Sequence, residues 1–228
     1  MKIIGGKLVS RKLLKKEHVV ISAGIGSDLD FEMGISRKLG NTVIGIDPTK
    51  VSLNFLTRIS KVNSNLMQRF KFINKALTAN GERLEFFSGD QDRMATTSKN
   101  HSIGNTNTFD FEGISLGDLI RNNNVGYLKL DIEGYEYQLF EALLIEFRIP
   151  QIAIEFHHFC VDELTAVDAL EFINKMEEKG YTAYDFGSWA GRSRKLPRNV
   201  SLFKDNLVEI LFVLESEKQF DEKSQIKL

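Results

Sequence analysis

The chain has 228 residues, of which 42% are hydrophobic, and its 30 lysines and arginines nearly balance its 31 aspartates and glutamates. This composition predicts a globular protein with a sizeable core, and the near-zero net charge argues against a general nucleic-acid binder. Cys160 is the only cysteine, so no intrachain disulfide can form, and no apolar run is long enough to span a membrane. We therefore expect a cytoplasmic protein without nucleic-acid or membrane partners.

The expected domain covers residues 18–215, where apolar runs and capped helical segments alternate. Residues 1–17 are a basic segment that lacks the apolar stretch of a signal peptide, and residues 216–228 form a charged tail. In the first half we expect strands at 18–23, 42–46, 70–78 and 84–87, with helices at 28–39 and 49–62. The polar residues 88–108 predict a long loop, which is usually functional or disordered.

The second half repeats this alternation. We expect helices at 115–122, 136–147 and 164–179, with strands at 127–133, 151–157, 181–186 and 209–214. The inward face of the helix at 164–179 is expected to consist of Leu164, Val167, Leu170, Ile173 and Met176. Alternating strands and helices predict an α/β fold, with a mostly parallel sheet covered by helices on both faces.

A glycine turn follows the first strand of the domain, in the sequence Ala23-Gly-Ile-Gly-Ser-Asp28. Such a turn lets the backbone approach a ligand, and the next helix offers free N–H groups, with Ser27 or Asp28 as its cap. Leu29 stands where a dinucleotide fingerprint has its third glycine. Asp28 would repel a pyrophosphate but could accept from an amino group. A plain strand-to-helix turn is the simpler alternative.

A carboxylate ends the second strand, in the sequence Ile44-Gly-Ile-Asp-Pro48. Asp47 lies about 20 residues after the glycine turn, which is the spacing expected when two adjacent strands flank one helix. There it could accept the hydroxyls of a ribose. Alternatively, Asp47 is only a turn residue before proline.

Three charged residues alternate along the expected strand at 127–133, where Lys129, Asp131 and Glu133 share one side. Such a triplet is costly to bury, and it lies at the carboxyl end of a strand, where open α/β sheets bind ligands. The simpler alternative is an ion pair between Lys129 and Asp131.

On the next strand, Glu155 and His157 share one face by the same period. If the two strands are neighbours, these side chains meet Asp131 and Glu133. The cluster could take a proton from a hydroxyl with His157 as the base, or bind a hard divalent metal through its carboxylates. We favour the metal-free version, because Lys129 could neutralise one carboxylate.

A basic stretch with Arg192, Arg194, Lys195 and Arg198 lies beside Trp189. It could steer an anionic substrate, but charge runs are more often solvated loops, and we favour that interpretation.

Together these motifs resemble the FkbM-type methyltransferases, which depend on S-adenosylmethionine. The matching pieces are Ile21-Ser-Ala-Gly-Ile-Gly-Ser-Asp28, Gly45-Ile-Asp-Pro48, Asn74-Lys-Ala-Leu77, Ser115-Leu-Gly-Asp-Leu119, Leu128-Lys-Leu-Asp-Ile-Glu-Gly-Tyr-Glu136 and Ile154-Glu-Phe-His157. The run from Leu128 is the most specific. One departure is Ser22, which stands where many relatives carry an acidic residue.

The resemblance implies a Rossmann-like, seven-stranded methyltransferase sheet whose last strand is antiparallel. The cofactor-binding residues that it implies are Gly24, Gly26, Ser27 and Asp28 near the methionine end, Asp47 and Pro48 near the ribose, Ala76 near the adenine and Asp131 near the methyl group. Asp131, Glu155 and His157 are the expected catalytic residues. The acceptor would be a hydroxyl on a small molecule, which could be anionic or glycosidic.

O-methylation is favoured because Asp131-Ile-Glu-Gly134 replaces the Asn/Asp-Pro-Pro-Tyr/Phe motif that is typical of amino-nitrogen methylation. A nicotinamide-dependent oxidoreductase on the same architecture is one alternative, although the third glycine and a Tyr-x-x-x-Lys pair are missing. A non-catalytic cofactor-binding module is another alternative.

Overall fold

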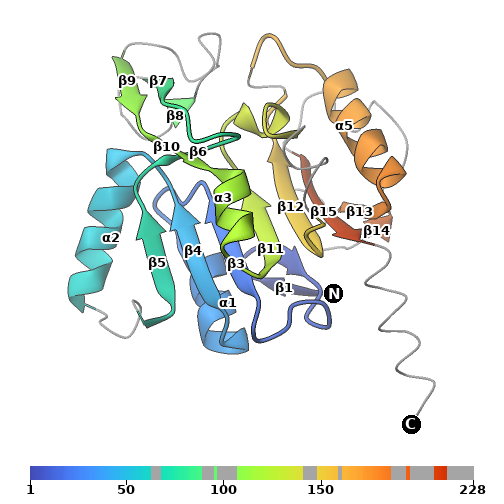
Figure 1. Ribbon diagram of the computed structural model, residues 1–228, viewed down its shortest axis with the longest axis horizontal. Helices are drawn as coiled ribbons and strands as arrows, with labels where there is room; N and C mark the ends of the chain where they lie inside the picture. The colour runs from blue at the N-terminus through green and yellow to red at the C-terminus, as the bar shows by residue number, and fades with distance from the viewer. Residues whose placement is uncertain are drawn as a thin grey trace.

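A computed structural model of the protein describes residues 1–62, 68–88, 95–96, 107–140, 148–158, 161–185, 194–195 and 208–214. A central sheet forms the middle layer, and Figure 1 shows its strands side by side. None of the helices within these ranges has the length and apolar composition that a bilayer crossing would need.

The central sheet has seven main strands and a two-residue edge strand. In spatial order they are β5 (Phe70–Ile73), β4 (Thr42–Ile46), β3 (Val19–Ala23), β11 (Val125–Leu130), β12 (Gln151–Phe156), β15 (Val208–Leu214), β13 (Tyr181–Asp185) and the edge strand β14 (Arg194–Lys195). The pairs from β5 to β12 are parallel, whereas β15 runs antiparallel to both of its neighbours. This confirms the predicted mostly parallel sheet with an antiparallel last strand.

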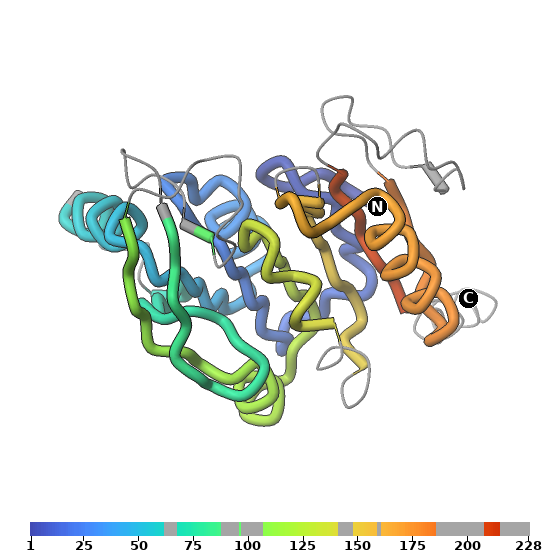
Figure 2. The backbone as a smooth tube through the Cα atoms, turned by 90° about the horizontal axis from the view of Figure 1, so that it is seen from above, coloured from blue at the N-terminus to red at the C-terminus, as the bar shows by residue number. Residues whose placement is uncertain are grey.

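Helices cover both faces of the sheet and bury two apolar clusters. The α-helices given by the described residues are α1 (Asp30–Leu39), α2 (Lys50–Val62), α3 (Leu116–Arg121) and α5 (Ala166–Glu178). Side chains of α3 and α5 pack with one face of β11, β12 and β15, and side chains of α1 and α2 pack with the other face. Figure 2 shows α1 and the N-terminal segment on the opposite side of the sheet from α3.

The inward face of α5 agrees with the prediction in part. Ile173 and Met176 are buried as predicted and Leu170 packs against the core, whereas Val167 is 62% exposed. Ala169 and Phe172, which the prediction left out, are buried. Residues three apart are rotated by about 300° on a helix with 3.6 residues per turn, so a strict spacing of three drifts by about 60° at each step. A capping box between Thr165 and Asp168 fixes where this helix begins.

The N-terminal residues form a hairpin that packs on the sheet. Strands β1 (Lys2–Ile4) and β2 (Lys7–Val9) pair antiparallel. The apolar side chains that this segment buries are Ile4, Leu8, Val9, Leu13 and Leu14. The hydroxyl of Tyr127 on β11 donates to the carbonyl oxygen of Leu8 at 2.9 Å. Residues 1–17, expected as a basic segment ahead of the domain, therefore cover one face of its sheet.

The expected strand at 70–78 is two strands, because the chain leaves the central sheet after β5. Strand β6 (Ala76–Thr78) pairs with β10 (Gly113–Ser115), and a separate antiparallel sheet contains β7 (Leu84–Ser88), β8 (Ala95–Thr96) and β9 (Asn107–Phe111). The predicted loop at 88–108 thus contains the last residue of β7, all of β8 and the start of β9, and its other residues lie outside the described ranges. Of the predicted helix at 136–147, residues 136–140 are described: the 3-10 turn η2 (Tyr135–Tyr137) is followed by a turn, and Phe140 is helical.

Truncation of Phe172 should test the observed face of α5. Its ring packs against Phe140, Phe156 and Phe212. We expect Phe172→Ala to lower the free energy of unfolding by about 3–5 kcal/mol, the usual cost of removing a buried aromatic ring. Urea denaturation followed by circular dichroism measures this loss. The control Val167→Ala should change stability by less than about 0.5 kcal/mol, and equal losses in both variants would contradict this helix orientation.

Candidate functional site

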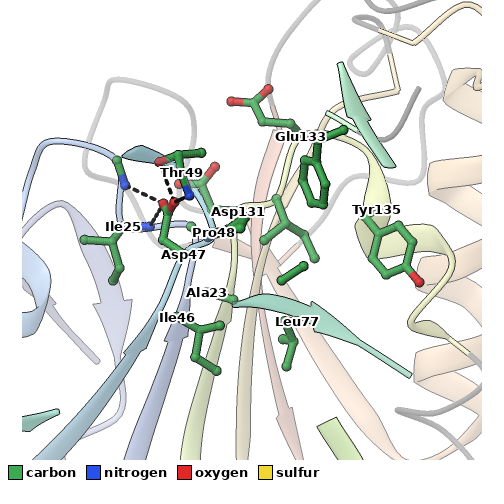
Figure 3. A pocket seen from close by; sticks show the side chains of 15 residues that line it. Ala23, Ile25, Ile46, Asp47, Pro48, Thr49, Leu77, Asp131, Glu133 and Tyr135 are labelled. Carbon is green, nitrogen blue, oxygen red and sulfur yellow. Dashed lines mark hydrogen bonds between the residues drawn. The ribbon is translucent and has the colours of Figure 1, made fainter. Parts of the chain in front are cut away.

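A pocket of about 180 Å³ opens at the carboxyl ends of β3, β4 and β11. Its lining residues come from the turns after these strands, from β6 and β7, and from η2: Ala23, Gly24, Ile25, Gly26, Ile46, Asp47, Pro48, Thr49, Ala76, Leu77, Phe86, Asp131, Ile132, Glu133 and Tyr135. Figure 3 shows Asp47 and Thr49 on one side of it, Tyr135 on the opposite side and Asp131 between them. This position matches the place where open α/β sheets bind their ligands.

Gly24 fits its place only as glycine. Its φ is +81°, and a Cβ atom there would lie 1.7 Å from the carbonyl oxygen of Asp131. The backbone N–H of Asp131 in turn donates to the carbonyl oxygen of Ala23 at 3.2 Å. The glycine turn and the residue that follows β11 are therefore in direct backbone contact across the pocket floor.

The carboxylate of Asp47 holds the glycine turn in place. Its Oδ2 accepts from the backbone N–H groups of Ile25 and Gly26, both at 2.9 Å. Its Oδ1 accepts from the backbone N–H of Thr49 at 2.8 Å and from the Thr49 hydroxyl at 2.6 Å. Asp47 thus lies in the pocket wall, as predicted for a ribose ligand, and it also acts as the turn residue of the alternative interpretation.

The remaining predicted cofactor residues divide into two groups. Gly26, Pro48 and Ala76 line the pocket. Ser27 and Asp28 are exposed and lie outside its lining, and Oδ1 of Asp28 accepts from the backbone N–H of Asp30 at 2.8 Å. The N-cap of α1 is Leu29, and no side chain makes a cap hydrogen bond there, so the predicted capping role of Ser27 or Asp28 is wrong.

A buried polar group lies beneath the glycine turn, at Ser22. The hydroxyl of Ser22 donates to Oε1 of Glu32 at 2.5 Å, so α1 brings a carboxyl group to this corner. Burial raises the pKa of Glu32, against the opposing charge of Lys129. The ammonium group of Lys129 donates to the carbonyl oxygen of Gly24 at 2.7 Å. Sequence reasoning missed Glu32; its one signal is an acidic residue beside Phe31 on the buried face of α1.

The predicted cluster of Asp131, Glu155 and His157 forms as expected, because β11 and β12 are neighbours. Nε2 of His157 lies 3.8 Å from Asp131, 3.8 Å from Glu155 and 3.6 Å from Glu133. Asp131 is the member that faces the pocket, with 26% of its side chain exposed, whereas Glu155 lies outside the lining. The predicted ion pair also exists, since Lys129 Nζ lies 3.1 Å from Asp131 Oδ2.

Glu136 is a further member of the site that sequence reasoning did not assign. It is fully buried, and its carboxylate accepts from the backbone N–H groups of Ile132 and Gly134 at 2.8 and 2.9 Å. Its Oε1 also lies 3.0 Å from Nδ1 of His157. Because the carboxylate can only accept, Nδ1 donates in this bond. Glu136 therefore fixes both the turn after β11 and the orientation of the imidazole.

The surroundings of His157 favour its charged form. Burial lowers its pKa, but the charges and hydrogen bonds of Glu136, Glu133 and Asp131 outweigh burial and raise the pKa to about 10. The pKa of Asp131 is lowered, because Lys129, Lys7 and His157 outweigh the effect of its burial. At neutral pH His157 is an imidazolium, which cannot accept a proton. Its expected role as a base with an ordinary pKa is therefore not supported.

The same cluster has the spacing of a cation site. One ligand atom each from Asp131, Glu155 and His157 lies within 4.8 Å of the others. Two ammonium groups already contact these carboxylates, however. Lys129 lies 3.1 Å from Asp131, and Lys7 lies 3.1 Å from Glu155. This arrangement favours the metal-free version of the predicted site.

Little of the predicted basic loop is described. Arg194 and Lys195 form β14, which pairs with β13 at the edge of the sheet. Trp189, Arg192 and Arg198 lie outside the described residues, so the role of this loop stays a prediction.

Most of this chain matches the model of one protein family. The model of the "Methyltransferase FkbM domain" matches residues 13–183. The chain belongs to the FkbM methyltransferase family. The resemblance seen in the sequence motifs is therefore confirmed. No curated protein matches the chain.

Several solved structures resemble this FkbM-family chain. A methyltransferase FkbM from Methylobacillus flagellatus KT has 15% identity and a TM-score of 0.51, and the match covers 88% of this chain and 44% of that chain. A precorrin-6y C5,15-methyltransferase from Geobacter metallireducens GS-15 has 11% identity and a TM-score of 0.47, covering 89% and 84%. M. jannaschii TYW2 in complex with AdoMet has 10% identity and a TM-score of 0.41, covering 89% and 71%. These likenesses concern the fold, and the chain spans less than half of the first of these proteins.

The charged state of His157 predicts a pH dependence of stability. A folded pKa of about 10 against an unfolded value of 6.5 stabilises the fold fully below pH 6.5, and this contribution is lost as pH rises toward 10. We expect the free energy of unfolding to fall by about 1–3 kcal/mol between pH 7 and pH 9. Urea denaturation at several pH values measures the slope.

Glu136→Gln should flatten this slope, because it removes the charge that contacts Nδ1 of His157. The control is Glu171→Gln on the exposed face of α5, which should keep the slope of the unmodified protein. A slope that does not respond to Glu136→Gln would contradict the assigned charge of His157.

Proposed function

We propose that this protein is an S-adenosylmethionine-dependent methyltransferase that methylates a hydroxyl oxygen of a small molecule. The observation that carries the proposal is the contact of Gly24 with Asp131, which joins a bare glycine turn to a carboxylate on one pocket floor. Membership of the FkbM family supports the same conclusion.

The lining residues fit the proposed cofactor. Ala76, Leu77 and Phe86 form an apolar wall suited to a flat base, and the Gly24–Gly26 turn leaves backbone open to a polar ligand. Asp47 remains the proposed ribose ligand. Its Oδ1 is the oxygen that could exchange a partner, since both of its present partners belong to Thr49, whereas Oδ2 holds the turn.

When bound, the cofactor would supply an electrophilic methyl group on its sulfonium sulfur. Asp131 is the proposed catalytic carboxylate: it would orient the acceptor hydroxyl and take its proton while the oxygen–methyl bond forms and the sulfur–methyl bond breaks. Glu155 and the charged His157 would act behind it. Their role is to hold Asp131 in place.

The proposed acceptor is an uncharged polyhydroxyl compound, such as a sugar or a secondary metabolite. Asp131 and Glu133 are the charged side chains beside the methyl-transfer position, and no lysine or arginine is among the described lining residues. Such a wall disfavours an anionic acceptor near the donor. The Asp131-Ile-Glu-Gly134 turn, in the place of an amino-methylating motif, supports oxygen as the target.

Calorimetry with four ligands tests the cofactor assignment. We expect S-adenosylmethionine and S-adenosylhomocysteine to bind with dissociation constants of about 1–100 μM, near usual metabolite levels. NAD and NADP should bind at least about 100-fold more weakly, because a third glycine is missing. Tight nicotinamide binding without a response to S-adenosylhomocysteine would instead support the oxidoreductase alternative.

Asp131→Asn tests the catalytic assignment. With S-adenosylmethionine labelled in its methyl group and a pool of sugars and other small hydroxyl compounds, we expect transfer to fall by about 100-fold or more. The affinity for S-adenosylhomocysteine should stay within about 3-fold, since the carboxamide keeps the shape of the carboxylate. Asp118→Asn, on the exposed end of α3, is the matched control. Full transfer by Asp131→Asn would leave this residue a structural role only.

A further inference from the structure

Lys7 reaches the charged cluster from outside the family domain. It lies on β2, before residues 13–183 that the family model matches. The hairpin is held firmly at this point: Leu8 and Val9 are buried, and the backbone N–H of Ser10 donates to Oε1 of Gln151 at 2.6 Å. The Lys7 side chain is only 14% exposed.

The ammonium group of Lys7 contacts carboxylates from three neighbouring parts of the sheet. It lies 2.7 Å from Glu209 on β15, 3.1 Å from Glu155 on β12 and 4.0 Å from Asp131 after β11. These carboxylates bring a high negative charge to a region that is largely withdrawn from water. The ammonium group of Lys7 is therefore an ion-pair partner that these three carboxylates share.

The sheet itself creates the need for this cation. Glu155 and Glu209 are directly opposite each other in the pairing of β12 with β15. Like charges at such positions repel each other, and burial makes the repulsion stronger. Burial raises the pKa of Glu209 to about 7, although Lys7 opposes this shift. Both carboxylates can remain charged in this place only with a positive group between them.

We propose that Lys7 is a positioning residue that acts as the resident cation of this cluster, in the place that a divalent metal could otherwise take, and thereby holds Asp131 at the pocket floor. Lys129 fixes Asp131 from the side of the glycine turn, and Lys7 fixes it from the side of β12 and β15. The N-terminal hairpin thus completes the site electrostatically. The expected effect of Lys7 on the pocket rests on the proposed function, whereas its expected effect on cation binding does not.

Electron paramagnetic resonance of Mn²⁺ tests the proposal without substrate or cofactor. The unmodified protein should leave the signal of free Mn²⁺ unchanged, because its cluster already contains an ammonium group. Lys7→Met should bind about one Mn²⁺ with an affinity at least about 10-fold higher, and Mn²⁺ should raise its thermal midpoint. Lys7→Arg should behave like the unmodified protein, as should Lys12→Met, which removes an exposed lysine of the same segment.

Two results would overturn the proposal. One is Mn²⁺ binding by the unmodified protein, which needs no variant, and the other is a folded Lys7→Met that binds no Mn²⁺. If Lys7→Met does not fold, Lys7→Gln keeps hydrogen-bond donors on an uncharged side chain that is one atom shorter, and it takes the place of Lys7→Met in the experiment. Adding Glu155→Gln to Lys7→Met should abolish the Mn²⁺ site.

Calorimetry with S-adenosylhomocysteine then measures the effect on the pocket. Lys7→Met should keep this affinity within about 3-fold, as Asp131→Asn does, but should lower transfer of the labelled methyl group by about 10-fold or more, and Lys7→Arg should restore transfer. A protein whose unmodified form binds no S-adenosylhomocysteine would refute the proposed function but leave the Mn²⁺ result to decide the role of Lys7. Unchanged transfer by a folded Lys7→Met would show that Lys7 does not position Asp131.

Discussion

The site depends on the close approach of two backbone segments at Gly24 and Asp131. A side chain at position 24 would collide with the carbonyl oxygen of Asp131, so this contact exists only because a glycine follows β3. Asp47 fixes the other side of the same turn through two N–H groups. The ends of β3, β4 and β11 are therefore joined into one rigid frame. Pocket shape and the position of the Asp131 carboxylate follow from this frame, not from separate flexible loops.

Buried charge is the main cost of this arrangement, and the fold offsets it by bringing opposite charges from several elements. Asp131 lies between Lys129 and Lys7, and Glu136 contacts the imidazolium of His157. Beneath the turn, Glu32 of α1 hydrogen-bonds Ser22. Glu32 thus places a carboxyl group beside Ser22, the residue that β3 contributes to this corner. Each group has a partner, as buried charges require, because an unpaired one would cost several kcal/mol.

Local patterns were sufficient to predict the central strands, the glycine turn and the meeting of Asp131 with Glu155 and His157. These features follow from period-two alternation and from the adjacency of consecutive parallel strands. The contributions of Lys7, Glu32 and Glu209 could not be predicted, because they depend on how a hairpin, a helix face and the last strand pack on the sheet. On α5 the prediction holds for Ile173 and Met176 but is wrong for Val167, since a strict spacing of three does not follow one side of a helix.

The turn after β11 points its carboxylates in two directions. Glu133 has a φ of +55°, a conformation that costs a non-glycine residue about 1–3 kcal/mol. Three hydrogen bonds hold it there. The Glu136 carboxylate accepts from two neighbouring backbone N–H groups, and the Thr96 hydroxyl donates to the Glu133 carbonyl oxygen. Because of this turn, Asp131 and Glu133 face the pocket while Glu136 faces inward to His157. The inward carboxylate, together with Glu133 and Asp131, raises the pKa of His157, so the imidazole is already protonated where it meets the carboxylates of the site.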